Sequence, residues 1–147
     1  MADLPGSVLF CCTLNALRSP MAEGMMKMLH GKQVFVDSVG IRAGELDPFA
    51  VVAMDEIGID IGRHRPKTFD NLEDTSFDLI ISMSPEAHHR ALEMTRTMAC
   101  EVEFWNTFDP SLIEGSRDVR LDAYREVRDQ LMRRIRQRFP AGLVPVF

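Results

Sequence analysis

The sequence contains no apolar run that approaches the ~20 residues required by a membrane-spanning helix. Its start, MADLPGSVLFCC, places an acidic residue, a proline and a glycine before a short apolar run, which is not the pattern of a secretory signal peptide. We therefore expect a cytoplasmic protein that does not bind membranes.

Cysteine is scarce, and its positions exclude two common uses. Cys11, Cys12 and Cys100 do not form an even disulfide framework, and no CxxC or cysteine–histidine cluster offers the spacing of metal ligands. We expect reduced thiols, one of which is reactive, and neither a bound metal nor a cofactor.

Basic residues are outnumbered, with 17 Lys and Arg against 22 Asp and Glu and a net charge of −5. This balance argues against a nucleic-acid partner. Residues 117–147 are nevertheless rich in arginine, which suits either a patch that binds an anion or a nucleic acid, or the solvated face of an amphipathic helix. Acidic residues such as Asp122 and Asp129 are interleaved among these arginines at helical spacing, which favours a helix face with paired charges.

No internal repeat or linker divides the chain, so we treat residues 1–147 as one domain. Short apolar runs alternate along it with segments that begin at capping residues. The predicted strands are Ser7–Cys11, Gln33–Ser38, Phe77–Met83 and Glu101–Trp105. The predicted helices begin at Ser19-Pro20, at Asp47-Pro48 with Gly58 as its end, at Ser84-Pro85, and at Asp118, the last running to Arg138.

Strands that alternate with helices and are themselves almost continuously apolar predict an α/β fold. We expect a single-domain, three-layer structure in which helices flank a four-stranded parallel sheet. Ligands of such sheets bind at the carboxyl ends of the strands. The loop between Cys12 and Ser19 follows the first strand and therefore lies at this edge.

This loop has the pattern Cys-x5-Arg-Ser, from Cys12 through Arg18 to Ser19. Its backbone N–H groups and the helix N-terminus can converge on an oxyanion, which Arg18 would hold with its planar fork of donors. The same positive field favours the thiolate form of a cysteine, so Cys12 is predicted as a nucleophile with Ser19 as a hydroxyl donor. The alternative is an inert buried thiol. The predicted oxyanion-binding residues are Thr13, Leu14, Asn15, Ala16, Leu17 and Ser19, and Asn15 suits an unusual backbone conformation.

Transfer of a phosphoryl group also needs a proton donor for the leaving oxygen. Asp109, which is followed by a proline, is the candidate, although its spacing also suits a turn or a helix cap. Cys11 is expected to face the core, because adjacent strand residues point to opposite faces. We expect His64 to be structural, and the pair His88-His89 to lie at the surface.

The chain resembles the low-molecular-weight protein tyrosine phosphatases, and the arsenate reductases of the same fold, over nearly its whole length. VLFCCTLNALRSPMAEG is similar to the family's first strand, phosphate loop and first helix, and FDP to its general-acid loop. DSVGIRAGELDPFAVVAMDEIGID resembles its second strand and helix, and FDLIISM its third strand. The resemblance implies a phosphate-monoester hydrolase that acts on a phosphorylated protein or small molecule through a phosphocysteine.

The same resemblance implies roles for individual residues. Cys12 would be the nucleophile, Arg18 would bind the oxyanion, and Asp109 would protonate the leaving group and then activate water. The supporting residues that it implies are Asn15, Ser19, Ser38 and His64.

The chain departs from the family's pattern in ways that bear on substrate. Leu17 stands where a second loop cysteine is common, and Ser111, Leu112 and Ile113 replace the tyrosines that usually follow Asp-Pro, which removes much of the wall for an aryl phosphate. GIRAGELDP and FWNTFDP are more similar to arsenate reductases, but residues 84–99 lack the cysteine pair of the thioredoxin-coupled members. An arsenate reductase linked to thioredoxin or to glutathione and glutaredoxin is therefore the alternative, and a non-catalytic oxyanion-binding module is a third possibility.

Overall fold

A sheet of four parallel strands forms the centre of the molecule. The strands are β1 (Ser7–Cys12), β2 (Phe35–Gly40), β3 (Leu79–Ser82) and β4 (Glu101–Phe104). The computed structural model describes residues 4–73 and 76–140, and within them the strand order is β2-β1-β3-β4 with every neighbouring pair parallel. The predicted α/β fold with a four-stranded parallel sheet is therefore confirmed.

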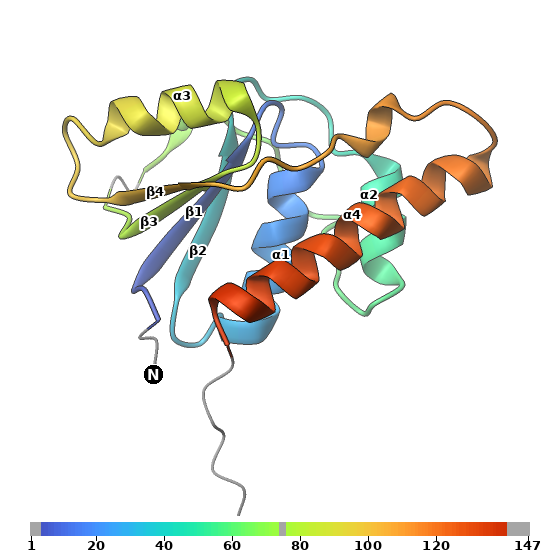
Figure 1. Cartoon of the computed structure of the whole chain (residues 1–147), viewed down its shortest axis with the longest axis horizontal. Coiled ribbons are helices and arrows are strands. Elements are labelled where there is room, and N and C mark those ends of the chain that lie inside the picture. Colours follow the sequence, from blue (N-terminus) through green and yellow to red (C-terminus); the bar gives the residue numbers. More distant parts are fainter. Residues whose placement is uncertain (1–3, 74–75, 141–147) are drawn as a thin grey trace, which may run out of the picture.

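Helices cover both faces of this sheet. They are α1 (Arg18–His30), α2 (Pro48–Asp55), α3 (Pro85–Met94) and α4 (Arg117–Arg138), with short 3-10 turns η1 (Phe69–Asn71) and η2 (Pro110–Leu112). α1 packs on β1 and β2, α4 packs on α1 and α2, and α3 packs on the other side against β1, β3 and β4 (Figure 1). In residues 4–73 and 76–140, no helix has the length and apolar character needed to cross a membrane.

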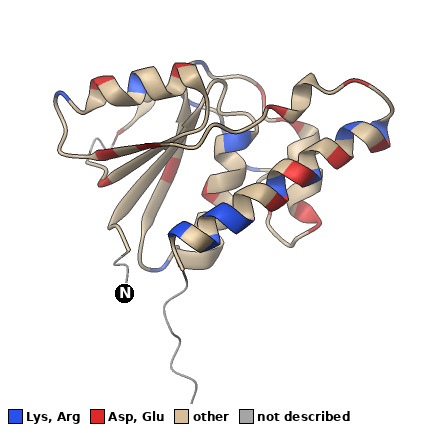
Figure 2. Cartoon of the chain, viewed as in Figure 1, with Lys and Arg blue, Asp and Glu red and all other residues tan. Residues whose placement is uncertain are grey.

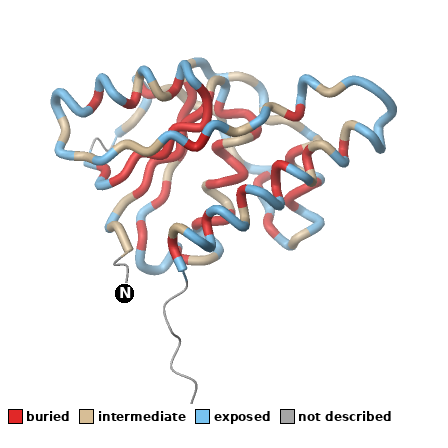
Figure 3. The backbone as a smooth tube through the Cα atoms, viewed as in Figure 1, coloured by how far each residue is buried: buried red, intermediate tan, exposed pale blue. Residues whose placement is uncertain are grey.

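Each face of the sheet has its own buried apolar cluster. Figure 3 shows that the central strands are largely buried, whereas the helices alternate between buried and exposed residues. Side chains alternate along β1, so that Phe10 and Cys12 belong to the cluster under α1 and α4, whereas Leu9 and Cys11 belong to the cluster under α3. The expectation that Cys11 faces the core is confirmed. The two adjacent cysteines therefore point to opposite sides of the sheet.

The predicted signals for the ends of two helices are confirmed. Asp47 and Ser84 are the N-caps of α2 and α3, and each accepts a hydrogen bond from a backbone N–H in the first turn. After α2 the chain turns at Gly58, whose φ of 78° is the left-handed conformation that favours glycine. The N–H of Ile59 donates to the carbonyl of Met54, as expected when a glycine ends a helix.

Several other boundaries were predicted wrongly, and β3 (Leu79–Ser82) is shorter than the predicted strand Phe77–Met83. α1 begins at Arg18 rather than after Ser19, because the Ser19 hydroxyl is not free to cap a helix and instead contacts the Cys12 sulfur. β2 begins two residues later than predicted, because the N–H of Val34 bonds to the His30 carbonyl in the turn that follows α1.

The arginine-rich helix α4 carries alternating charges along its length (Figure 2). Arg125 pairs with Asp122 on its own helix at 2.7 Å and with Glu56, which follows α2, at 2.6 Å. Arg128 is buried and also pairs with Glu56, at 2.8 Å. The predicted charge pairing within the helix is confirmed, and part of it joins α4 to α2.

Candidate active site

A cavity of about 750 Å³ opens at the carboxyl end of β1. Its walls come from five parts of the chain: the loop after β1, the segment before and within the first turn of α2, the first turn of α3, the loop that leads into η2, and the first turn of α4. The lining residues are Cys12, Thr13, Leu14, Ala16, Leu17, Arg18, Arg42, Glu45, Leu46, Asp47, Pro48, Phe49, Glu86, Asp109, Ser111 and Arg120. The three predicted catalytic residues, Cys12, Arg18 and Asp109, are thus brought to one cavity.

Residues 12–18 form a loop whose carbonyl groups are bonded in part to the segment 41–47. The carbonyls of Thr13, Leu14 and Ala16 each accept a backbone hydrogen bond of 2.9 Å from segment 41–47. In a trans peptide the N–H of the next residue points the opposite way from the carbonyl. The N–H groups that follow these carbonyls therefore face away from segment 41–47, as an oxyanion-binding loop requires.

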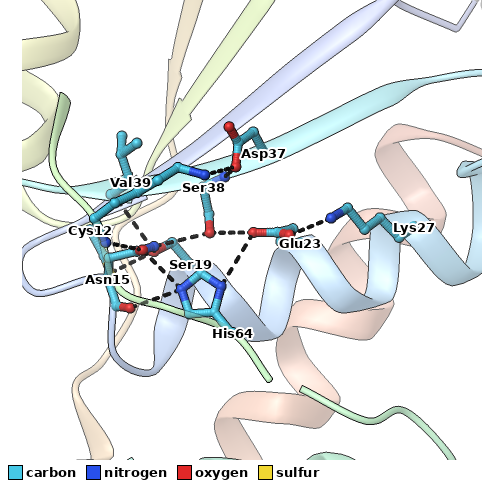
Figure 4. Close-up of polar contacts among 10 residues, drawn as sticks. Cys12, Asn15, Ser19, Glu23, Lys27, Asp37, Ser38, Val39 and His64 are labelled. Carbon is cyan, nitrogen blue, oxygen red and sulfur yellow. Dashed lines mark hydrogen bonds and ion pairs between the residues drawn. The ribbon is translucent and has the colours of Figure 1, made fainter. Parts of the chain in front are cut away.

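Asn15 holds this loop in shape (Figure 4). Its φ of 52° confirms the expectation of an unusual backbone conformation. Its side-chain nitrogen donates to the hydroxyls of Ser19 at 2.8 Å and Ser38 at 3.0 Å. Its side-chain oxygen accepts from the Lys67 backbone N–H at 3.0 Å and from His64 Nε2 at 2.9 Å. One buried amide thus connects loop 12–18 with α1, β2 and segment 64–67.

The sulfur of Cys12 lies 2.9 Å from the Ser19 hydroxyl and is almost fully buried. Because Asn15 donates to the same hydroxyl, the Ser19 hydrogen must point elsewhere. Its possible acceptors are the Cys12 sulfur and the Val39 carbonyl, and the carbonyl is farther away, at 3.5 Å. Ser19 is therefore oriented to donate to the sulfur.

His64 connects Asn15 with Glu23 in the same network (Figure 4). Its Nε2 faces only oxygen atoms of Asn15, which are acceptors, so Nε2 carries the hydrogen. Its Nδ1 lies 3.8 Å from a carboxylate oxygen of Glu23, which also accepts from the Ser38 hydroxyl. Burial lowers the pKa of His64, and the charge of Glu23 opposes this effect in part. Sequence reasoning missed Glu23, although it lies four residues after Ser19 and so on the same face of α1.

Arg18, at the start of α1, contacts the loop that leads to Asp109. Arg18 Nη1 donates to the Thr107 carbonyl at 2.9 Å, two residues before Asp109. One oxygen of Asp109 accepts from the backbone N–H of Ser111 at 3.0 Å and from its hydroxyl at 2.6 Å, so Asp109 is also the N-cap of η2. The two roles considered for Asp109, in the cavity and as a cap, therefore coexist in one side chain.

The other cysteines lie away from this cavity. Cys11 is fully buried on the opposite face of the sheet, where burial raises the pKa of its thiol. Cys100 packs against the same cluster on that face. Cys12 is therefore the one cysteine in the cavity, since all three cysteines fall within the described residues.

The prediction that both histidines of the pair 88–89 lie at the surface was wrong for His88. Its Nδ1 lies 2.8 Å from the buried hydroxyl of Ser82, and its ring stacks on Phe104 with centroids 4.6 Å apart. His89 is exposed, as expected. His88 is half-buried because α3 packs over the ends of β3 and β4, which the local sequence did not indicate.

One wall of the cavity is made by residues that sequence reasoning missed. Phe49 packs against Tyr124 with centroids 5.3 Å apart, and the guanidinium of Arg120 lies 4.5 Å from the centroid of the Phe49 ring. The Tyr124 hydroxyl donates to Asp47 at 2.5 Å. No motif connects these positions, because α2 and α4 are far apart in the sequence.

Comparisons with known proteins agree with this geometry. A family model described as low molecular weight phosphotyrosine protein phosphatase matches residues 7–143. A protein of Bacillus subtilis named arsenate reductase is 33% identical over 130 residues, which cover 88% of this chain and 92% of that protein.

Solved structures of the same fold carry other activities in their names. A low molecular weight protein tyrosine phosphatase from T. tengcongensis superimposes with a TM-score of 0.70 at 27% identity, covering 86% of this chain and 92% of that one. The arginine phosphatase YwlE, with a phosphorylated active-site serine, also gives a TM-score of 0.70 at 27% identity, covering 89% of this chain and 91% of that one. Because the family model spans nearly all of the sequence, this chain belongs to the low molecular weight phosphotyrosine protein phosphatase family.

Proposed function

We propose that this chain hydrolyses phosphate monoesters through a phosphocysteine formed on Cys12. The observation that carries the proposal is that Asp109, which is far from Cys12 and Arg18 in the sequence, lines one cavity with them. The loop geometry around Asn15 supports it, because segment 41–47 binds three of the loop's carbonyls and the N–H groups that follow them face the other way. The substrate is a phosphorylated protein or small molecule, and the cytoplasm, where thiols stay reduced, is the compartment that suits the nucleophile.

Two steps complete the reaction. In the first, the Cys12 thiolate attacks phosphorus, the bond to the leaving oxygen breaks, and Asp109 gives its proton to that oxygen. In the second, water attacks phosphorus, Asp109 takes a proton from the water, and the sulfur–phosphorus bond breaks to release inorganic phosphate. Arg18 and the loop N–H groups hold the remaining oxygens through both steps, and the Ser19 hydroxyl stabilises the thiolate.

The test is the hydrolysis of 4-nitrophenyl phosphate by the wild type and three variants. Cys12→Ser should abolish turnover, and Asp109→Asn should lower kcat by about 10²–10⁴-fold. Cys100→Ser, on the other face of the sheet, is the matched control and should retain wild-type rates. Turnover by Cys12→Ser would overturn the mechanism, and phosphate binding without any turnover in the wild type would indicate an oxyanion-binding module.

Arsenate reduction is the second candidate, favoured by the similarity to proteins named arsenate reductase. It requires a thiol to reduce the arsenic held on Cys12, and neither Cys11 nor Cys100 lies in the cavity. The reductant would therefore have to be an external thiol such as glutathione. To test for this activity, arsenite formed from arsenate is measured once with thioredoxin and once with glutathione and glutaredoxin as the reductant. We expect no arsenite in either, and its formation would favour the reductase.

A further inference from the structure

Two arginines that line the cavity, Arg42 and Arg120, are not used by the proposed reaction. Arg120, near the start of α4, lines the cavity together with Asp109 and Ser111. Among the described residues, no acidic side chain forms an ion pair with it. Its guanidinium is instead held against the ring of Phe49, 4.5 Å from the ring centroid.

The Phe49 ring that contacts Arg120 is held in place by residues of both α2 and α4. Phe49 is half-buried and packs against Tyr124, whose hydroxyl is bonded to Asp47 at the start of α2. A guanidinium that rests its face on an aromatic ring still presents the N–H groups along its edge. Arg120 is therefore a positioned cation whose donors remain for a ligand.

Arg120 lies on the side of the cavity that holds Asp109, because η2, whose N-cap is Asp109, packs on α4. Both side chains line the cavity together with Ser111. The charges of Arg120 and Asp109 also act in opposite directions on the pKa of Tyr124, which burial and the hydrogen bond to Asp47 raise. Because Asp109 is our proton donor to the leaving oxygen, a substituent on that leaving group comes close to Arg120.

The other charges of the cavity are already engaged or lie at its rim. Arg42 pairs with Glu86 at 3.3 Å, and Asp47 accepts the hydrogen bond from Tyr124. Glu45 is exposed and forms no ion pair within the part of the chain that the structure describes. Among the described residues, Arg120 is thus the cation of the cavity that an aromatic ring holds in place and that no acidic side chain pairs with.

We infer that Arg120 is a specificity-determining residue that selects phosphate monoesters whose leaving group carries a negative charge. This inference rests on the proposed hydrolysis and names its substrate class. A carboxylate on the leaving group would accept from the edge of the guanidinium, in the bidentate geometry that arginine favours. Phe49 and Arg120 then form the wall on the leaving-group side, where Ser111, Leu112 and Ile113 offer no aromatic side chain.

The test compares kcat/KM for 4-carboxyphenyl phosphate, phenyl phosphate and 4-(aminomethyl)phenyl phosphate. The ratio of the anionic to the neutral substrate is measured in the wild type and in Arg120→Gln, so that intrinsic differences in reactivity cancel. We expect the ratio to fall about three- to tenfold in Arg120→Gln. Arg117→Gln is the matched control, because Arg117 lies farther from the Phe49 ring, at 5.9 Å, and does not line the cavity. It should keep the wild-type ratio.

Two results would overturn the inference: an unchanged ratio in Arg120→Gln, or a wild-type preference for the aminomethyl substrate. The second result would mean that Glu45, rather than Arg120, selects the leaving group, and that the preferred leaving group is cationic. Binding measurements with benzylphosphonate and 4-carboxybenzylphosphonate need no turnover. They therefore test the role of Arg120 separately from the proposed hydrolysis. Tighter binding of the carboxylated phosphonate, lost in Arg120→Gln, supports the inference even where no substrate is hydrolysed, and equal binding of the two compounds contradicts it.

Discussion

Gly40 and Asn15 touch backbone to backbone: a Cβ atom on Gly40 would lie 2.6 Å from the backbone nitrogen of Asn15. Such an atom would also lie 2.8 Å from the carbonyl carbon of Leu14. The end of β2 therefore packs directly against the backbone of loop 12–18, and there is no room for a side chain at position 40. Because these neighbours are main-chain atoms, the clash is not relieved by rotating a side chain.

Gly40→Ala should therefore displace loop 12–18. We expect a loss of about 1–3 kcal/mol in the free energy of unfolding, together with reduced turnover and weaker phosphate binding. Urea unfolding and phosphate titration measure these changes. Gly62→Ala is the control, because the nearest atom to its Cβ belongs to the side chain of Asp60, at 3.1 Å. Wild-type stability and phosphate affinity in Gly40→Ala would contradict the backbone contact.

Asn15→Asp should remove the hydrogen bonds that the Asn15 side chain donates and keep those that it accepts. The carboxylate still accepts from Lys67 and His64 but does not donate to Ser19 and Ser38, so the Ser19 hydroxyl loses the contact that orients it toward Cys12. We expect kcat to fall and the free energy of unfolding to drop by about 1–3 kcal/mol.

The matched control for this substitution is Asn71→Asp. Asn71 uses its side-chain oxygen to accept from Thr68, an acceptor that the substitution keeps, and it lies at the surface. Equal effects of the two substitutions on kcat would show that the amide of Asn15 has no special role in the loop.

His64 should make stability depend on pH. Burial lowers its pKa from 6.5 in the folded state, so the unfolded chain binds a proton more readily. The neutral ring thus contributes stability that is complete above pH 6.5 and is lost as the pH falls from there through the lowered folded pKa. Unfolding free energies from pH 8 to pH 5 should decline less steeply in His64→Gln than in the wild type. The exposed His89→Gln should follow the wild-type curve, and an identical slope in His64→Gln would refute the assignment.

The Tyr124–Asp47 hydrogen bond should couple α4 to the start of α2. Tyr124→Phe removes the donor and leaves an acceptor in a half-buried position, so we expect a loss of about 1–2 kcal/mol in the free energy of unfolding. A double-mutant cycle with Asp47→Ala isolates the contact from the N-cap role of Asp47. A coupling energy near zero would mean that the two residues act independently.

The sequence by itself determined the local features of this protein. The apolar runs predict the parallel sheet, because strands covered by helices on both faces need apolar side chains along their length. Asp47 and Ser84 mark helix starts, since their side chains bond to N–H groups two or three residues away. The pattern from Cys12 to Ser19 likewise predicts an oxyanion loop, because its geometry is set by a few consecutive residues.

The tertiary structure alone decided which distant groups meet that loop. His64 and the backbone of Lys67 donate hydrogen bonds to Asn15, and Arg18 donates to the carbonyl of Thr107. Arg120 likewise contacts the ring of Phe49 in the wall of the same cavity. In each pair the two residues are far apart in the sequence. The half-buried position of His88, which follows from the packing of α3 over β3 and β4, has the same origin. Local propensity does not specify such contacts, because they depend on how helices pack on the sheet and on which polar groups must find partners once buried.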